Sequence, residues 1–314
     1  MLLQFTVLAS GSSGNASLLR FRHFGLLVDV GLGPRLLAQR LAQLGATWDD
    51  VHAVLLTHTH SDHWSERTLT HLCRRRIPLY CHAGHHHGLQ HYSRTFVAMR
   101  EQQLVLEYEA GKTFELVPGL TCLPVMLRHD CGATFGFRFE ICGTEIGERR
   151  ALAYAADLGT WDAHITGALA DVDLLALEFN HDVNMEQASG RSRSLIKRVL
   201  SDYGHLSNAQ ASALLEAILR RSSPGRLRHV VQLHLSRDCN RPALARSAAQ
   251  GILRALAPWV ELHTASQAGV SPTFVLSTPH YPAAIASMTR LAARGVRFKE
   301  LVKSVQPLLP CMAD

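Results

Sequence analysis

The sequence predicts a layered α/β domain, and three observations support this fold class. Short apolar runs of strand length alternate with turns through the first half of the chain. Segments with apolar residues at helical spacing lie among them, and reactive polar side chains follow the ends of the runs. Apolar residues make up 47% of the 314 residues, enough for a sizeable core. Because no long linker or repeat interrupts the chain, we expect one domain over residues 1–278 and a helical extension over 279–314.

The N-terminal part is predicted to begin with strands. Strands are expected over residues 5–9, 16–21 and 25–30, with a turn of Gly and Ser between the first two. Residues 34–44 carry apolar side chains at helical spacing and are followed by a glycine, which predicts an amphipathic helix. A buried strand is expected over residues 51–57, and a group of histidines begins where it ends.

The rest of the chain continues the alternation of strands and helices. Further strands are expected over residues 77–81, 103–108, 120–127, 134–141, 151–156, 174–179, 229–235 and 272–276. Helices are expected over residues 208–221 and 242–256 and, in the extension, over 284–303. Ligands at strand ends are common to many sheets, so this pattern leaves the topology open.

Composition argues against several classes of protein. The seven cysteines are scattered and never form a CxxC pair, which disfavours a disulfide framework or a structural zinc knot. No apolar run is long enough to cross a bilayer and no signal peptide is visible, so we expect a cytoplasmic protein without a membrane partner. The net charge of +6 favours a polyanionic partner only weakly, because it does not locate the charge. The nineteen histidines, several of them clustered, indicate metal chemistry.

The most informative cluster follows the strand expected over residues 51–57. His58 and His60 lie two residues apart, so in extended chain both imidazoles face the same side. Asp62 and His63 follow as the chain turns, and four potential ligands in six residues can serve two adjacent ions. Such nitrogen and oxygen donors suit Zn²⁺, Mn²⁺ or iron, and two such ions can share a hydroxide nucleophile. A chance run of surface histidines is the alternative, which the position directly after an apolar strand disfavours.

The string His58-Thr59-His60-Ser61-Asp62-His63 resembles the signature of the metallo-β-lactamase superfamily, and Asp29 stands where that superfamily has an aspartate behind the ligands. The resemblance implies a four-layer αββα fold and two divalent ions, Zn²⁺ or Mn²⁺. It also implies three further ligands, in the expected order, at His129, Asp157 and His234. One ion would then be held by His58, His60 and His129, and the other by Asp62, His63 and His234, with Asp157 bridging them.

Two of these positions have another interpretation. Asp130, beside His129, could supply an oxygen donor, and Asp157 could merely cap a turn. Asp62 is expected to contribute to catalysis as well as to metal binding.

Four strings resemble the YycJ/WalJ-like branch of the superfamily, over residues 7–16, 177–182, 204–208 and 234–240. The resemblance covers residues 4–276 and implies a metal-dependent phosphodiester hydrolase, a DNA exonuclease acting in repair, in which a metal-activated water attacks phosphorus. A small-molecule hydrolase on the same metal site, a cyclic phosphodiesterase or a thioesterase, is the alternative. The chain has no room for the inserted domain of the β-CASP nucleases, which disfavours RNA processing of that kind.

Glu178 and His205 resemble a glutamate and histidine that stand beside the phosphate in ribonuclease Z. Phosphodiester cleavage builds negative charge on the nonbridging oxygens and on the leaving alkoxide. A histidine outside the metal ligands can bind that charge or donate a proton, and a glutamate can orient it. The alternative is that His205 caps the helix beginning near residue 207 and Glu178 is its salt-bridge partner.

Substrate contacts are predicted on two segments. Ser12, Ser13 and Asn15 could offer hydroxyl, amide and backbone N–H groups to a phosphate, although an ordinary tight turn explains them equally well. Arg191 and Arg193 precede His205 and could hold the backbone of a nucleic acid, DNA rather than RNA, although arginine groups are more often solvated. The sequence does not predict an oligomeric state.

A second group of histidines, His82, His85, His86 and His87, matches no motif. We expect it to form an exposed loop, with an adventitious metal site as the alternative.

Overall fold

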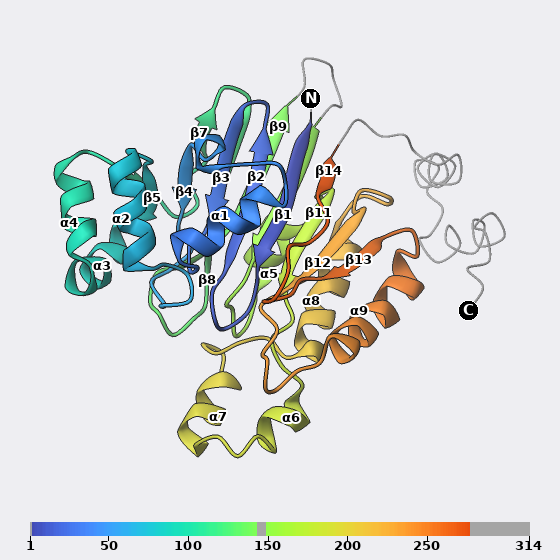
Figure 1. Ribbon diagram of the computed structural model, residues 1–314. Helices are drawn as coiled ribbons and strands as arrows, with labels where there is room; N and C mark the ends of the chain where they lie inside the picture. The colour runs from blue at the N-terminus through green and yellow to red at the C-terminus, as the bar shows by residue number, and fades with distance from the viewer. Residues whose placement is uncertain (1, 143–148, 277–314) are drawn as a thin grey trace.

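Two β-sheets lie face to face in the structure, a computed structural model that describes residues 2–142 and 149–276 (Figure 1). Their strands are β1 (Leu3–Ala9), β2 (Ala16–Phe21), β3 (Phe24–Val28), β4 (Ala53–Leu55), β5 (Leu79–His82), β6 (Val105–Tyr108), β7 (Phe114–Val117), β8 (Leu120–Leu127), β9 (Thr134–Cys142), β10 (Arg149–Ala155), β11 (Leu174–Glu178), β12 (His229–Leu233), β13 (Glu261–Thr264) and β14 (Phe274–Leu276).

The helices in the described part of the chain are α1 (Pro34–Ala42), α2 (Glu66–Arg75), α3 (His86–Tyr92), α4 (Arg94–Glu101), α5 (Ala163–Leu169), α6 (Val183–Gln187), α7 (Arg193–Val199), α8 (Asn208–Arg221) and α9 (Pro242–Leu256). Short 3₁₀ helices span Trp48–Asp50 and Ala83–His85. The helical extension predicted over residues 279–314 lies outside the described residues.

The strand order sets which loops meet. The first sheet has the order β14-β1-β2-β3-β4-β5-β6 and the second β13-β12-β11-β10-β9-β8-β7. Strands β3 to β6 run parallel to one another, as do β10 to β13. Because parallel neighbours end at the same edge of a sheet, the loops that follow these strands are brought together.

The main core fills the space between the two sheets. Strand β9 shows why: Phe135, Phe137 and Phe139 alternate along it, so all three rings point to one face, where they are fully buried. The first sheet contributes Phe5, whose ring meets that of Tyr154 edge to face with the centroids 6.4 Å apart. Burying one such side chain stabilises the fold by roughly 2–3 kcal/mol, so the inner faces hold the sheets together.

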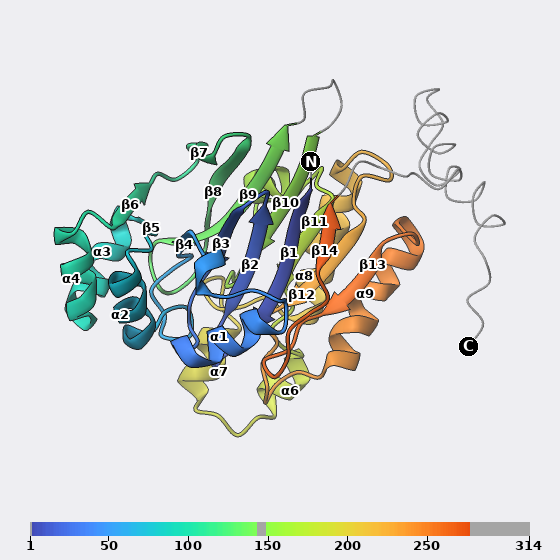
Figure 2. The same ribbon diagram turned by 45° about the horizontal axis from the view of Figure 1, so that its top comes forward.

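Helices cover both outer faces. Helix α1 lies across the first sheet, while α5, α8 and α9 cover the second (Figure 2). Helix α8 presents Ala211, Leu214, Leu215 and Ile218 to the second sheet at helical spacing. Its first turn is capped by Ser207, which exchanges hydrogen bonds with Gln210. The layers confirm the predicted αββα fold.

The prediction for the second histidine group is wrong. Residues 82–87 do not form an exposed loop: His82 ends β5, Ala83–His85 form the 3₁₀ helix, His86 begins α3, and His85 is only 1% exposed. Burial of this imidazole is compensated because its Nε2–H donates to the carbonyl of Ala133 at 2.9 Å, and its ring meets Phe135 at 5.9 Å between centroids.

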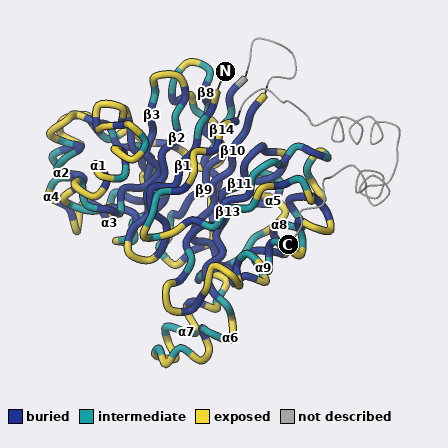
Figure 3. The backbone as a smooth tube through the Cα atoms, turned by 45° about the vertical axis from the view of Figure 1, so that its right-hand side comes forward, coloured by how far each residue is buried: buried dark blue, intermediate teal, exposed yellow. Residues whose placement is uncertain are grey.

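Helices α6 and α7 project from the end of the sheets (Figure 1), and most of their residues are exposed or half-buried (Figure 3). They form a short arm between β11 and α8. None of the described helices has the length and apolar character that crossing a bilayer requires.

Candidate metal centre

The predicted site residues stand at the carboxyl ends of strands from both sheets. Asp29 follows β3, and the string that begins at His58 follows β4. In the second sheet Glu178 ends β11 and His234 follows β12 directly. Because these ends meet at one edge, residues separated by up to 172 positions come within a few ångströms, as Asp62 and His234 do.

Three of the predicted site residues, Asp29, Asp157 and His234, have a left-handed backbone conformation although none is glycine. The φ angles are 62° at Asp29, 58° at Asp157 and 54° at His234. This conformation costs roughly 1–2 kcal/mol for a residue with a Cβ atom. Each bend turns the chain sharply at a strand end and directs a carboxylate or imidazole between the sheets.

The loop that carries Asp62 is held from behind. A Cβ atom added to Gly31 would lie 1.8 Å from the carbonyl oxygen of Asp62, so only glycine fits there. The backbone N–H of Asn15 donates to that same carbonyl at 2.7 Å, and the N–H of Val30 donates to the carbonyl of His63 at 2.8 Å. The loop is therefore fixed before any ligand binds.

Three imidazoles form the first group of donors. The ring centroids of His58, His60 and His129 lie 4.9, 5.0 and 5.3 Å apart. His129 donates its Nδ1–H to the carbonyl of Gly204 at 2.8 Å, which turns its Nε2 toward His60. The Nε2 of His58 is buried and has no hydrogen-bond partner among the described residues. Burial and then the nearby His63 hold the pKa of His58 well below its usual value, so this imidazole is neutral.

The second group mixes imidazoles with a carboxylate. Asp62 Oδ2 lies 3.2 Å from His234 Nε2 and 3.5 Å from His63 Nε2. On its other side, His63 donates Nδ1–H to Asp29 Oδ2 at 2.7 Å, and Thr57 donates its N–H and hydroxyl to the same carboxylate. A carboxylate behind an imidazole fixes its tautomer and makes the free nitrogen a better ligand.

Asp157 lies between the two groups. Its Oδ2 is 3.1 Å from His63 Nε2, and its Oδ1 is 3.1 Å from His234 Nδ1 and 3.9 Å from His129 Nε2. Although burial opposes ionisation, His234 and His63 hold the pKa of Asp157 well below its usual range. It contacts imidazoles of both groups, which is more than a turn cap would do.

The donor set fits divalent cations. Two triplets, one of His58, His60 and His129 and one of Asp62, His63 and His234, each have donor atoms within 4.8 Å of one another. The carboxylates make the site favourable for positive charge: despite burial, Asp157, Asp62 and Glu178 raise the pKa of His234 to about 10. An unpartnered nitrogen on His58, and donors that are all nitrogen or oxygen, suit Zn²⁺ or Mn²⁺.

Glu178 and His205 form a pair beside these groups. His205 donates Nδ1–H to Glu178 Oε1 at 2.7 Å, and the same oxygen lies 3.1 Å from His234 Nδ1. The other carboxylate oxygen of Glu178 accepts the backbone N–H groups of Leu158 and Leu206. Burial opposes ionisation, but His205 lowers the pKa of Glu178 to about 2. The alternative role of His205 as a helix cap does not fit, because Ser207 caps α8.

A cavity of about 540 Å³ opens over this edge. Residues of both donor groups line it, together with His205, Ser12 and residues from the arm of α6 and α7. Arg198 of the arm donates to Asp130 Oδ2 at 2.6 Å, and Asp130 Oδ1 lies 3.3 Å from His129 Nε2. The arm is thus tied to a segment that carries a predicted ligand.

The predicted substrate residues divide in the structure. Ser12 lines the cavity, whereas the backbone N–H of Ser13 donates to Gln267. Asn15 is 2% exposed and its Nδ2 lies 3.2 Å from Asp62 Oδ2, so it contacts a candidate ligand. Arg191 lines the cavity but pairs with Glu186 and Asp238 of its own chain, and Arg193 is an exposed residue that is not among those lining the cavity.

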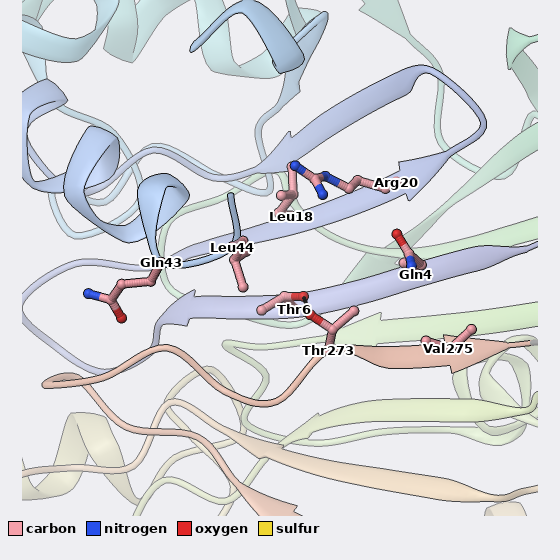
Figure 4. A pocket seen from close by; sticks show the side chains of 8 residues that line it. All are labelled: Gln4, Thr6, Leu18, Arg20, Gln43, Leu44, Thr273 and Val275. Atoms are coloured by element: carbon pink, nitrogen blue, oxygen red, sulfur yellow. Dashed lines mark hydrogen bonds between the residues drawn. The ribbon is translucent and has the colours of Figure 1, made fainter. Parts of the chain in front are cut away.

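Another cavity, of about 430 Å³, lies on the outer face of the first sheet between α1 and β14 (Figure 4). Of the side chains that line it, Arg20 alone is ionisable, and the others include Gln4, Thr6 and Thr273. It offers no metal-binding donor set, unlike the cavity over the strand ends.

Sequence reasoning gave no role to Thr57, Asn180 or Asn240, although all three lie at or directly behind the site. The two asparagines fall inside the strings over residues 177–182 and 234–240. Those strings were therefore the signal that could have found them.

Comparison with known proteins agrees with this geometry. The family model described as the beta-lactamase superfamily domain matches residues 25–224. Exodeoxyribonuclease YycJ of Bacillus anthracis is 28% identical over 252 residues, which cover 80% of this chain and 89% of that protein. Exodeoxyribonuclease WalJ of Streptococcus pneumoniae is 28% identical over 243 residues, 77% of this chain and 85% of that protein. The metallo-β-lactamase fold protein YhfI of Bacillus subtilis superposes with a TM-score of 0.62 at 15% identity, over 88% of this chain and 100% of that one.

Proposed function

This chain belongs to the β-lactamase superfamily and is a metal-dependent hydrolase, and we propose that it is a DNA exonuclease that works with two divalent ions. The observation that carries the proposal is His205, which lines the cavity beside two groups of metal-binding donors and is paired with the buried Glu178. A thioester releases a thiolate, which leaves without a proton, whereas the alkoxide that leaves phosphorus is a poor leaving group unless it receives one.

The two ions would be held by residues that the fold already brings together. His58, His60 and His129 would hold one ion, Asp62, His63 and His234 the other, and Asp157 would contact both. Two divalent ions, when bound, make water a nucleophile near neutral pH and neutralise charge on the phosphoryl oxygens. Zn²⁺ or Mn²⁺ would suit these donors.

His205 is the chain's own proton donor in this proposal. Its Nδ1–H donates a hydrogen bond to the ionised Glu178, so Nε2 remains available for a substrate in the cavity. When the ring is doubly protonated it also carries a proton on Nε2, which it can give to the leaving alkoxide or share with a nonbridging oxygen of the phosphate. Its side chain is 14% exposed, so the ring can be reached from the cavity yet is held on one side.

The choice of DNA rests on the names of the relatives together with the basic residues near the cavity. The relatives that match over most of their length are exodeoxyribonucleases. Arg198, on the arm, lines the cavity and its side chain is 50% exposed, so it can reach a backbone phosphate.

Labelled single- and double-stranded DNA and RNA of equal sequence, incubated with the protein reconstituted with Mn²⁺ or Zn²⁺, test the proposal. We expect stepwise shortening of DNA from one end. Internal cuts, or shortening of RNA but not DNA, would contradict it.

One observation favours a small-molecule substrate instead. Arg191 and Arg198 are both paired with carboxylates of the chain, which leaves less free positive charge for a long polyanion. The cavity of about 540 Å³ is within the usual range for a small ligand. Turnover of cyclic nucleotides or thioesters, with rates that do not respond to salt, would favour this alternative.

A further inference from the structure

Backbone pairing between β11 and β12 stops where the site begins. The parallel register ends with Glu178 opposite Leu233, and one more bond runs from the N–H of Phe179 to the carbonyl of Leu233 at 3.0 Å. The left-handed φ of 54° at His234 then turns the chain, and the N–H of His234 donates to the hydroxyl of Ser10 at 2.8 Å. Beyond this point the two chain segments need another means of staying in register.

Asn180 joins the two segments beyond the end of the strand pairing. Its Nδ2 donates to the carbonyl of His234 at 2.8 Å, while its own carbonyl accepts the N–H of Ser236 at 2.8 Å. On the opposite side, the N–H of Asn180 donates to the carbonyl of Leu206, next to His205, at 3.0 Å. Asn180 therefore contacts both the segment that carries His234 and the segment that carries His205.

A second pair of amides lies behind Asn180. Asn208 Nδ2 donates to Asn240 Oδ1 at 2.9 Å, and Asn240 Nδ2 lies 3.0 Å from Asn208 Oδ1. Asn240 Nδ2 also donates to the carbonyl of Phe179 at 2.8 Å, and the N–H of Asn208 donates to the carbonyl of His181 at 2.8 Å. Asn208 and Asn240 are 6% and 3% exposed, so water does not compete for these bonds.

The pair joins the strings over residues 177–182, 204–208 and 234–240. Compared with an apolar pair, a buried amide pair contributes mainly specificity, because its directional hydrogen bonds allow only one relative geometry. Asn240 also accepts the N–H of Arg241 at the start of α9, so part of its role is structural. The bonds between Asn208, Asn240 and the carbonyls of residues 179 and 181 connect the segment of His205 with that of His234, whose ring centroids are 5.2 Å apart.

We propose that Asn208 and Asn240 are positioning residues that hold His205 at its working distance from the metal centre. The inference rests on the proposed function, because it gives His205 the role of proton donor. Neither asparagine is among the residues that line the cavity. Both therefore act through His205 and not on the substrate.

Leaving-group dependence tests this role. A DNA strand releases an alkoxide that needs a proton, whereas bis(4-nitrophenyl) phosphate releases a phenolate that does not. In the metal-loaded protein, His205→Ala should slow DNA cleavage about 10²-fold and slow the nitrophenyl ester far less. Asn240→Ala and Asn208→Ala should slow DNA cleavage about tenfold with less than about threefold effect on the ester. Bound metal per chain should equal that of the wild type.

The controls separate the possible failures. Asn184→Ala, on the exposed side of α6, should leave both substrates unaffected. Asn208→Asp keeps the size but removes the donor to Asn240, and it serves if the alanine variants do not fold. Equal loss on both substrates, or no loss on either, in the asparagine variants would overturn the positioning role while His205→Ala still showed the difference. If His205→Ala itself showed no difference between the substrates, its role as proton donor and the positioning role would both be wrong.

Discussion

Two histidine-rich regions of this protein differ in what surrounds them. The region that begins at His58 lies at the carboxyl ends of strands and meets the carboxylates of Asp29, Asp62 and Asp157. The region over residues 82–87 spans the end of β5, a 3₁₀ helix and the start of α3, where His86 lies 3.5 Å from the carboxylate of the exposed Glu107. The first region supplies grouped metal-binding donors, and the second supplies none in the described part of the chain.

The difference shows that the density of histidine in a sequence is a weak signal. Imidazoles become a metal site when strand ends bring them to carboxylates, and they become core or surface residues elsewhere. His85 is an example, because its burial is satisfied by a backbone carbonyl and aromatic rings.

The largest expected effect separates the two regions by function. Asp157→Asn should lower activity by at least about 10³-fold and reduce the bound metal, because the shared carboxylate loses its charge. His60→Ala should do the same. His87→Gln, at an exposed position of the second region, should change activity less than twofold. Activity assays measure the loss and elemental analysis measures the bound metal. A fully active Asp157→Asn protein would show that the first region does not need this carboxylate for function.

The next effect concerns the carboxylate behind the ligands. Asp29→Asn weakens the acceptor for His63 Nδ1–H, so the affinity for metal should fall about 10–100-fold while activity at saturating metal is largely kept. Competition with a chromophoric chelator measures this affinity. Unchanged affinity would show that Asp29 serves only the fold.

A smaller effect is expected at the rim of the cavity. Arg198→Ala should weaken DNA binding and reduce the slope of log affinity against log salt by about 0.7–0.9, because one phosphate contact is lost. Arg254→Ala, at an exposed position of α9, is the matched control. Arg191 is a poor choice for this test, because removing it would leave the buried Glu186 without its cation. An unchanged slope in the Arg198 variant would favour a small-molecule substrate.

The smallest effect is on stability and belongs to the second region. Burial lowers the pKa of His85 to about 4, so below pH 6.5 the unfolded chain takes up a proton that the folded chain refuses until about pH 4. The free energy of unfolding should therefore fall between pH 6.5 and 4, by at most about 3 kcal/mol from this group. His85→Gln should remove that part of the dependence. Urea denaturation of both proteins at pH 7.5 and 5 provides the comparison, and equal losses would contradict it.

Much of the fold followed from the sequence because apolar spacing reports burial. The helices predicted over residues 208–221 and 242–256 have the same bounds in the structure, since both carry a regular apolar face. Helices α3 and α4 were missed because His and Arg residues dilute their apolar period. At the site, the order of the motifs along the chain predicted the candidate ligands. The contacts of Asn15 and Asn240 could not be predicted, because they depend on how loops from distant strands pack.

Strand β14 has a consequence for how the chain is made. Its residues pair with β1, with Leu276 opposite Leu3. In the segment before β14, the N–H of Ser271 donates to the carbonyl of Val7. A ribosome releases β1 first and its partner more than 260 residues later, so the growing polypeptide carries an unpaired strand edge throughout that interval. Such edges recruit other chains. A product that terminates early, before residue 274, would keep this edge open and be prone to self-association, even though every candidate ligand is already present.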